Sequence, residues 1–159
     1  MNCWPGGGIL VAGALIGMHC MIERSFLDTN ILIYTDDADS PEKQQIALRL
    51  VESGWDSGNL VLSTQVLQEY FSAATRKLGV DPEAAQRKIQ LLAHLEVASI
   101  AHEDILLAID IHRLNRVSFW DALIVRMAQK TACSVLYSED MNAGQTLSGV
   151  RIVNPFESL

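Results

Sequence analysis

Short apolar runs alternate with longer helix-like patterns along most of the chain. Five runs rich in Val, Ile and Leu are expected to be strands, at residues 24–28, 59–64, 96–101, 133–138 and 150–154. Amphipathic patterns between them predict helices over residues 40–54, 63–79, 81–95, 102–115 and 118–131. Apolar strands that alternate with helices are typical of right-handed crossovers and of a parallel sheet with helices on both faces. The pattern therefore predicts an α/β fold.

Capping residues mark where several of these helices begin and end. Ser40 and Pro41 are expected to begin the first helix, and Gly54 to end it. Asp81 and Pro82 are expected to begin the third. No repeat, low-complexity tract or linker divides residues 21–159, so we expect these residues to form one domain.

The first twenty residues differ in kind from the rest. They contain no Lys, Arg, Asp or Glu, and their apolar stretch, residues 9–18, is short for a membrane span. A secretory signal would carry basic residues ahead of that stretch. Met21 reads as an ordinary start, so residues 1–20 are interpreted as an apolar leader that is poorly ordered, or as a non-native extension from an upstream start codon. A weak membrane anchor is the less favoured alternative, and we expect a cytoplasmic protein without stable membrane association.

The composition narrows the function classes. The chain has 159 residues, of which 49% are hydrophobic and 19% charged, so it is expected to be globular. A formal net charge of −7 argues against a protein that coats nucleic acid by bulk electrostatics. An enzyme that meets a polyanion through bound cations and a local basic rim stays possible. Cys3, Cys20 and Cys133 are odd in number and lack metal-site spacing, so they are interpreted as reduced thiols.

Four acidic residues fall near one edge of the predicted sheet. Asp28 ends the first strand and Asp140 follows the fourth. Asp121 lies near the start of the helix that leads into the fourth strand, and Glu69 lies in the helix after the second. Sites in open parallel sheets form beyond the carboxyl ends of the strands. The four acids are therefore candidates for one site.

Each acid also has a structural interpretation. Asp28 could cap a helix that begins at residue 29, and Asp121 could form a capping box with Ser118. Glu69 could be a solvated helix residue, and Asp140 could belong to a turn. The placement of all four at the same edge favours a shared function. Clustered carboxylates repel one another, and oxygen ligands without paired His or Cys favour Mg²⁺ or Mn²⁺ over Zn²⁺. Metal-assisted phosphodiester hydrolysis is the chemistry that uses such a cluster.

Five stretches together resemble a known family. They are "FLDTNILIY", "STQVLQEYF", "SFWDALIVRMA", "LYSEDMNAGQ" and "GVRIVNPF". They resemble a PIN domain, and above all the VapC-type toxins of bacterial type II toxin–antitoxin systems, over residues 22–157. The resemblance implies a three-layer α/β/α sandwich around a parallel sheet and a Mg²⁺- or Mn²⁺-dependent endoribonuclease. It also implies a homodimer that a small antitoxin protein inhibits.

The resemblance also assigns roles to residues. Asp28, Asp121 and Asp140 would hold the metal, and Glu69 would bind it through water or orient the attacking water. The catalytic residues would be these four acids, Asp28, Glu69, Asp121 and Asp140. Thr29, Asn30 and Ser138 would support them. The family alternatives are a housekeeping RNA-processing nuclease and a non-catalytic interaction domain on the same fold.

Basic and aromatic residues near these acids could contact RNA. Arg116, five residues before Asp121, and Arg76 and Lys77, at the end of their helix, could bind phosphate. Basic residues at a helix C-terminus also interact favourably with the helix dipole, and this structural role is the preferred interpretation. Trp120 could stack on a base, although packing is favoured.

An aspartyl-phosphate phosphatase is a rival class, but it needs a second Asp where this chain has Asn30.

Overall fold

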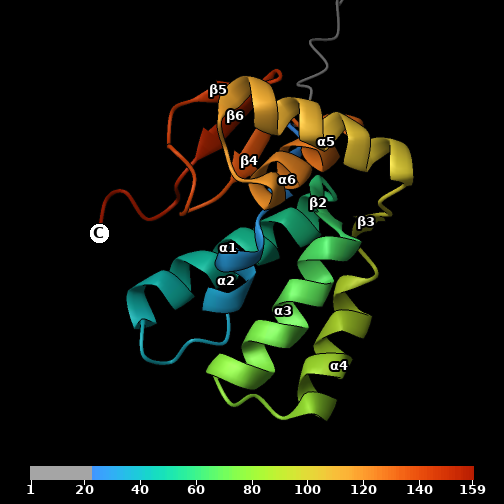
Figure 1. Cartoon of the computed structure of the whole chain (residues 1–159). Helices are drawn as coiled ribbons and strands as arrows, with labels where there is room; N and C mark the ends of the chain where they lie inside the picture. Colours follow the sequence, from blue (N-terminus) through green and yellow to red (C-terminus); the bar gives the residue numbers. More distant parts are fainter. Residues whose placement is uncertain (1–22) are drawn as a thin grey trace, which may run out of the picture.

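The computed structural model describes residues 23–159 of the chain (Figure 1). Its strands are β1 (Ser25–Leu27), β2 (Leu60–Ser63), β3 (Glu96–Ala98), β4 (Val135–Tyr137), β5 (Thr146–Leu147) and β6 (Val150–Val153). Its helices are α1 (Thr29–Tyr34), α2 (Pro41–Ser57), α3 (Thr64–Lys77), α4 (Pro82–Leu92), α5 (His102–Asn115) and α6 (Phe119–Lys130). The interpretation of residues 1–20 as a leader or extension lies outside the described residues.

The strands form one sheet in the order β3-β2-β1-β4-β6-β5. All neighbouring strands are parallel except β5 and β6, which are antiparallel. The parallel sheet is therefore confirmed, and the short edge strand β5 is an addition to it. Strands β1 and β2 are buried along their whole length, as expected of strands with helices on both faces.

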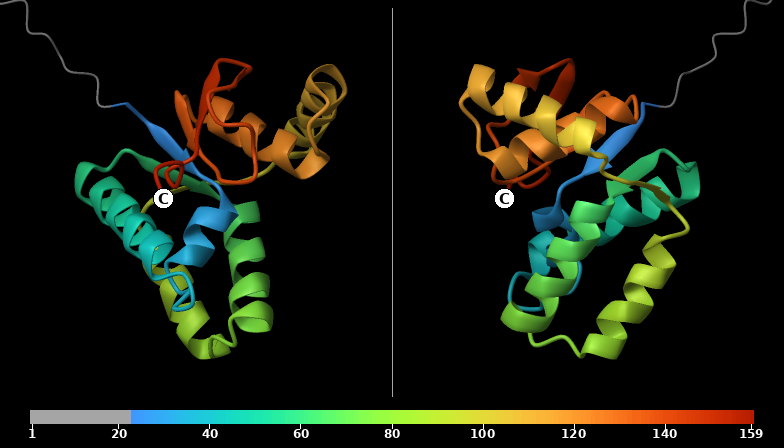
Figure 2. Two further views of the ribbon diagram at one scale, coloured as in Figure 1. Left: turned by 90° about the vertical axis from the view of Figure 1, so that its left-hand side faces the viewer. Right: turned by 45° about the vertical axis from the view of Figure 1, so that its right-hand side comes forward.

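Helices cover both faces of the sheet, as Figure 2 shows. Helix α2 lies on one side, and the packed pair of α5 and α6 lies on the other. The α3–α4 pair extends away from the sheet next to α1 (Figure 1). This arrangement confirms the α/β sandwich. The core between the layers includes Phe26, Leu62, Leu136 and Ile152, all fully buried.

One expected helix end is wrong. Helix α2 continues through Gly54 to Ser57, and its C-cap is Gly58, whose φ of 65° lies in the left-handed region. Gly54 is a buried residue of α2, and a Cβ at this position would lie 2.5 Å from the Cβ of Leu60. Glycine at this position allows α2 to approach β2 closely. The other marker, Asp81, caps α4 as expected by accepting hydrogen bonds from two backbone amides.

Two sequence interpretations can be checked against the described residues. Cys133 is buried and carries a free thiol, and Cys3 and Cys20 lie outside the described residues. Across residues 23–159, no helix combines the length and apolar character needed to cross a bilayer.

Candidate active site

The strand order reverses between β1 and β4, which predicts a ligand-binding edge at the carboxyl ends of these two strands. From β1 the chain proceeds outward through β2 and β3, and it then crosses to the other side of β1 to form β4. Such reversals of strand order leave a crevice at the carboxyl edge, where ligands of open α/β sheets bind. Asp28 directly follows β1, and Ser138 directly follows β4. The fold therefore places both residues at this edge.

Asp28 is held from three directions. Its Oδ1 accepts a hydrogen bond of 2.7 Å from the backbone amide of Thr29, so it caps α1. Its Oδ2 accepts hydrogen bonds from the hydroxyl of Ser138, at 2.7 Å, and from the amide nitrogen of Asn30, at 3.1 Å. Only 8% of Asp28 is exposed to solvent. The capping interpretation is thus correct for one oxygen, while the second oxygen faces the other supporting residues.

Glu69 is fixed through both of its carboxylate oxygens. The hydroxyl of Thr29 donates to Oε2 at 2.7 Å, and the side-chain amide of Gln65 donates to Oε1 at 2.9 Å. Glu69 is half-buried rather than freely solvated. Since Thr29 also donates its backbone N–H to Asp28, one residue orients two of the four acids.

Asn30 connects Asp28 to Asp140. Its amide nitrogen donates to Asp140 Oδ2 at 3.0 Å as well as to Asp28 Oδ2. Its carbonyl oxygen accepts a hydrogen bond from the backbone amide of Glu139, which anchors the loop after β4. The two carboxylates therefore lie within reach of the same amide nitrogen, although Asp140 itself is exposed.

Asp121 lies in the first turn of α6 beside a small hollow. Its backbone amide donates to Ser118 Oγ at 3.1 Å, which confirms Ser118 as the cap of α6. Within residues 23–159 its carboxylate accepts no hydrogen bond. Asp121, Asp140 and Arg116 line the same hollow of about 240 Å³, which we call the α6 hollow. The structure thus brings all four acids to one edge of the sheet, with Arg116 beside two of them.

The environment of Asp28 opposes its ionisation. Burial raises the pKa of this carboxyl to about 6, and the nearby charges of Asp121 and Glu69 contribute in the same direction. Hydrogen bonds from Ser138 and Thr29 lower the pKa, but less than burial raises it. Asp28 therefore carries a negative charge at neutral pH in a place that disfavours it.

Asp104 shows how the same chain treats another buried carboxylate. The side chain of Asp104 is 3% exposed and forms ion pairs with Arg126, at 3.1 Å, and Lys130, at 2.6 Å. Asp28 has no Lys, Arg or His partner in residues 23–159. Burying a charge without a counter-charge is costly. Asp28 is thus the buried acid for which an external cation would supply the missing charge.

The four acids offer oxygen ligands only, which suits a hard divalent cation. As the side chains stand, no three Asp, Glu, His or Cys residues in the described part of the chain converge closely enough to share one ion. A cation here would contact one or two carboxylates directly and others through water. Mg²⁺ is usually bound in proteins in this way, so the residues fit such an ion.

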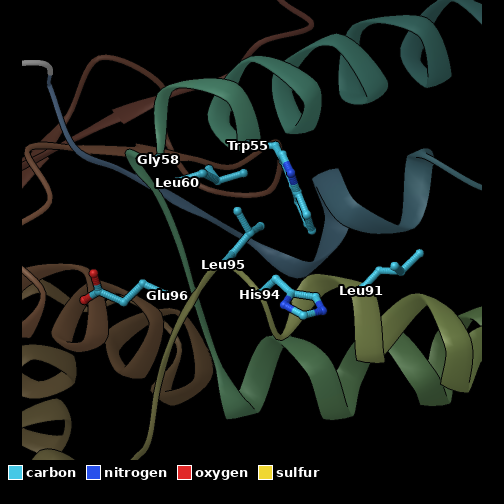
Figure 3. Close-up of a pocket in the computed structure, with 7 residues that line it drawn as sticks. All are labelled: Trp55, Gly58, Leu60, Leu91, His94, Leu95 and Glu96. Carbon is cyan, nitrogen blue, oxygen red and sulfur yellow. The ribbon is translucent and has the colours of Figure 1, made fainter.

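A larger hollow, of about 530 Å³, is lined by none of the four candidate acids (Figure 3). Its lining includes Leu60 and Glu96, with which β2 and β3 begin, so it is at the amino edge of the sheet. The rings of Trp55 and His94 meet there edge to face, with centroids 6.3 Å apart. Its walls are mainly apolar and hold no cluster of reactive groups, so it is not the candidate active site.

Sequence reasoning missed Gln65 and the partners of Glu139. Gln65 is four residues before Glu69 in α3, a spacing that places two side chains on the same helix face and could have identified it. Glu139, next to Asp140, accepts hydrogen bonds from Tyr34, at 2.6 Å, and from Lys43. This pairing of residues distant in sequence carries no local signal. Because Tyr34 and Lys43 hold the carboxylate of Glu139, Asp140 rather than Glu139 lies next to Asn30 at the site.

Comparison with protein families identifies one match. The model of the PIN domain family matches residues 25–146, which contain all four acids. None of the curated proteins matches the chain by sequence.

Several solved structures share the fold. VapC20 from Mycobacterium tuberculosis, a toxin that cleaves the sarcin–ricin loop, is 22% identical, with a TM-score of 0.58 over 73% of this chain and 89% of that one. A toxin–antitoxin complex from Klebsiella pneumoniae contains a chain that is 19% identical, with a TM-score of 0.61 over 84% of this chain and 98% of that one. A DNA-bound VapBC from Salmonella typhimurium contains a chain that is 20% identical, with a TM-score of 0.58 over 82% of this chain and 97% of that one.

Proposed function

Because the chain belongs to the PIN domain family, we propose that it is a Mg²⁺- or Mn²⁺-dependent endoribonuclease and the toxin of a toxin–antitoxin pair. The family match supports nuclease activity, and the similar solved structures that include toxins and toxin–antitoxin complexes support the more specific role. The site geometry supplies the argument for metal dependence.

The buried, uncompensated carboxylate of Asp28 carries the proposal. Asp104 is buried with two cationic partners, whereas Asp28 is buried with none in residues 23–159 and has Asp121 and Glu69 nearby. A protein keeps such an arrangement when an added cation or a reaction uses it. A divalent cation would offset the repulsion, and phosphate oxygens of RNA would complete its coordination.

We assign the four acids as follows. Asp28, Asp121 and Asp140 hold the metal, directly or through water, and Glu69 binds it through water or orients the attacking water. The bound ion supplies positive charge for the phosphate oxygens and makes water more acidic. The hydrogen bonds from Thr29 and Gln65 keep both oxygens of Glu69 in place.

Supporting residues keep the acids in a fixed arrangement. Ser138 and Asn30 donate to Asp28, and Asn30 also holds Asp140 near it. Prior orientation of this kind reduces the cost of ordering the site when substrate binds. Arg116, exposed in the α6 hollow beside Asp121, is placed to contact a substrate phosphate.

The proposed partners are RNA, a small antitoxin and a second copy of the chain, in the cytoplasm. Exposed apolar side chains gather on α5 and support association with another protein. They are Ile105, Leu106, Leu107, Ile109 and Leu114. Light scattering of the purified protein, alone and with the product of a neighbouring gene, tests both associations.

The first experiment measures RNA cleavage in Mg²⁺, in Mn²⁺ and in EDTA. The wild type should cleave only with a metal, and Asp121→Asn should lower the rate by at least about a hundredfold, the order found when one group that stabilises transition-state charge is removed. Asp56→Asn is the matched control, because Asp56 is an exposed acid on α2. Circular dichroism should show that both variants are folded. Equal cleavage by wild type and Asp121→Asn would refute the assignment.

A second experiment separates the toxin from the alternatives. Expression of the chain alone should arrest growth, and co-expression of the antitoxin should restore it. Active enzyme that leaves growth unaffected would favour a housekeeping RNA-processing nuclease. A folded protein that cleaves no RNA with either metal would favour a non-catalytic interaction domain.

A further inference from the structure

Most basic side chains of this acidic protein are paired with acids. Of the twelve Lys and Arg residues, eight form ion pairs: Arg24, Lys43, Arg87, Lys88, Arg113, Arg126, Lys130 and Arg151. Within residues 23–159, the four without an ion pair are Arg49, Arg76, Lys77 and Arg116. Three of these four line hollows that also contain a candidate catalytic acid. The cations without partners are therefore concentrated beside the site.

Arg76 and Lys77 share a hollow with Glu69. This hollow, which we call the α3 hollow, measures about 360 Å³ and runs along α3, with Ser72 and Ala73 in its wall. Seven residues of α-helix separate Glu69 from Arg76, or about 10 Å along the helix axis. At about 3.4 Å of rise per nucleotide of one strand, that distance corresponds to a few nucleotides. The hollow thus connects the catalytic edge to a pair of exposed cations.

The preferred interpretation of Arg76 and Lys77 from sequence was a favourable interaction with the helix dipole. That interaction requires only that the residues lie in the last turn of α3, which they do. It does not require the two cations to border the hollow that holds Glu69. Arg113, in the last turn of α5, has the same relation to its helix and pairs with Asp110 instead. The shared hollow is what distinguishes the α3 pair.

We propose that the α3 hollow binds the phosphate backbone of a single RNA strand, which passes from Arg76 and Lys77, over the acids, to Arg116 in the α6 hollow. The inference rests on the proposed function, since it extends the path of the same substrate. Trp120 packs edge to face against Phe119, with ring centroids 5.3 Å apart, yet it is still 61% exposed and lies beside Asp121. An exposed aromatic ring offers a stacking surface for an unpaired base, which favours a single strand over a duplex.

Contact between α3 and α6 supports a continuous path. Gln65 of α3 donates to Glu69 and, at 3.5 Å, to the backbone carbonyl of Trp120. Gln65 therefore links the wall of the α3 hollow to the first turn of α6, where Asp121 lies. The phosphate contacts fix the position of the strand and carry no sequence information. The α3 hollow should therefore bind RNA of any sequence.

The experiment compares the double variant Arg76→Gln/Lys77→Gln with two controls. Arg49→Gln removes an unpaired cation outside both hollows, and Arg113→Gln removes a cation from another helix C-terminus. All proteins carry Asp121→Asn, so that the probe is not cut. The probe is a fluorescent single-stranded RNA of mixed sequence and about 16 nucleotides. Anisotropy measures its Kd in Mg²⁺ between about 50 and 200 mM salt.

The double variant should raise the Kd by about fivefold or more at low salt. Its plot of log Kd against log salt should be less steep by about 1.4, since two phosphate contacts to a single strand are lost at about 0.7 each. Both controls should bind like their parent, and a duplex of the same sequence should bind more weakly. In proteins with Asp121 restored, the double variant should raise KM and leave kcat unchanged.

Three outcomes would overturn the inference: binding by the double variant equal to that of the controls, duplex binding as tight as single-strand binding, or no salt-dependent binding by the parent. The anisotropy assay needs no cleavage. If the Asp121→Asn protein binds the probe through Arg76 and Lys77 but the wild type cuts no RNA, the proposed function alone would therefore be refuted. A wild type that cuts RNA, with a double variant that binds normally, would refute this inference alone.

Discussion

Replacing Asp28 with Asn should stabilise the metal-free protein at neutral pH while it abolishes metal-dependent cleavage. Burial and the charges of Asp121 and Glu69 raise the pKa of Asp28 to about 6 in the folded chain, from 3.8 for an ordinary Asp. The folded state therefore binds a proton on Asp28 more tightly than the unfolded state does. Protonated Asp28 favours folding below pH 3.8, and this contribution is lost as the pH rises to about 6.

The size of the effect follows from that shift. A difference of about two pKa units corresponds to about 3 kcal/mol at pH values above both. Asn removes the charge, keeps the side-chain volume and remains a good N-cap. With its oxygen on the Thr29 amide, its NH2 group takes the place of Oδ2 and cannot accept from Ser138 and Asn30, which costs about 1 kcal/mol. We therefore expect a net gain of about 1–2 kcal/mol at pH 8, or about 2–8 °C in Tm.

Urea unfolding in EDTA at pH 4 and pH 8 measures this difference, with Asp140→Asn as the control. Asp140 is an exposed acid of the same site, so its replacement should change stability less at pH 8. Excess Mg²⁺ should stabilise the wild type and leave Asp28→Asn almost unchanged. If Asp28→Asn were less stable than wild type at pH 8 in EDTA, or if its advantage were the same at pH 4, the account of an uncompensated buried charge would be wrong.

Two further predictions concern parts of the fold that support the site. Gly54→Ala should lower the free energy of unfolding by about 1–3 kcal/mol, because its Cβ would lie 2.5 Å from that of Leu60; an unchanged urea midpoint would contradict this close contact. Burial raises the pKa of Asp104, but hydrogen bonds from Lys130, the Ala101 amide and Arg126 outweigh it and hold the pKa below its ordinary value. Asp104→Asn leaves Arg126 and Lys130 without their partner, so it should cost about 3 kcal/mol at pH 7, the order found for broken buried ion pairs. The cost should fall progressively as the pH drops below about 4, and urea titrations that show no such pH dependence would refute the role of these ion pairs.

Strands β1 and β2 could be predicted because burial on both faces gives them continuous apolar runs. Strand β5 was missed, since two residues carry no periodicity. A signal for it does exist in the turn that follows, where Ser148 and Gly149 have φ values of 50° and 84°. Two consecutive positive φ values are typical of a tight hairpin, and Ser-Gly is a turn dipeptide. The turn chemistry, rather than the strand itself, identifies this edge.

The end of α2 could not be predicted because glycine has two uses that look alike in a sequence. Gly58 ends the helix through its left-handed φ, whereas Gly54 provides room for Leu60. A close approach between two elements depends on tertiary packing, which local patterns do not contain. The same limit applies to the site: strand order predicts where Asp28 and Asp140 lie, but not that Asn30 donates to both.

The distribution of ion pairs bears on how an acidic protein could bind RNA, as the proposed function requires. Lys43 pairs with Glu139, which would otherwise add a further free carboxylate next to Asp140. Arg76, Lys77 and Arg116 line the two hollows yet form no ion pair with the acids there, so these cations remain free for phosphate. A direct ion pair between such a cation and Asp28 would remove the reason for a metal to bind. Under the proposed function, the separation of free acids at the carboxyl edge of the sheet from free cations in the flanking hollows would allow this edge to attract both a divalent cation and a polyanion.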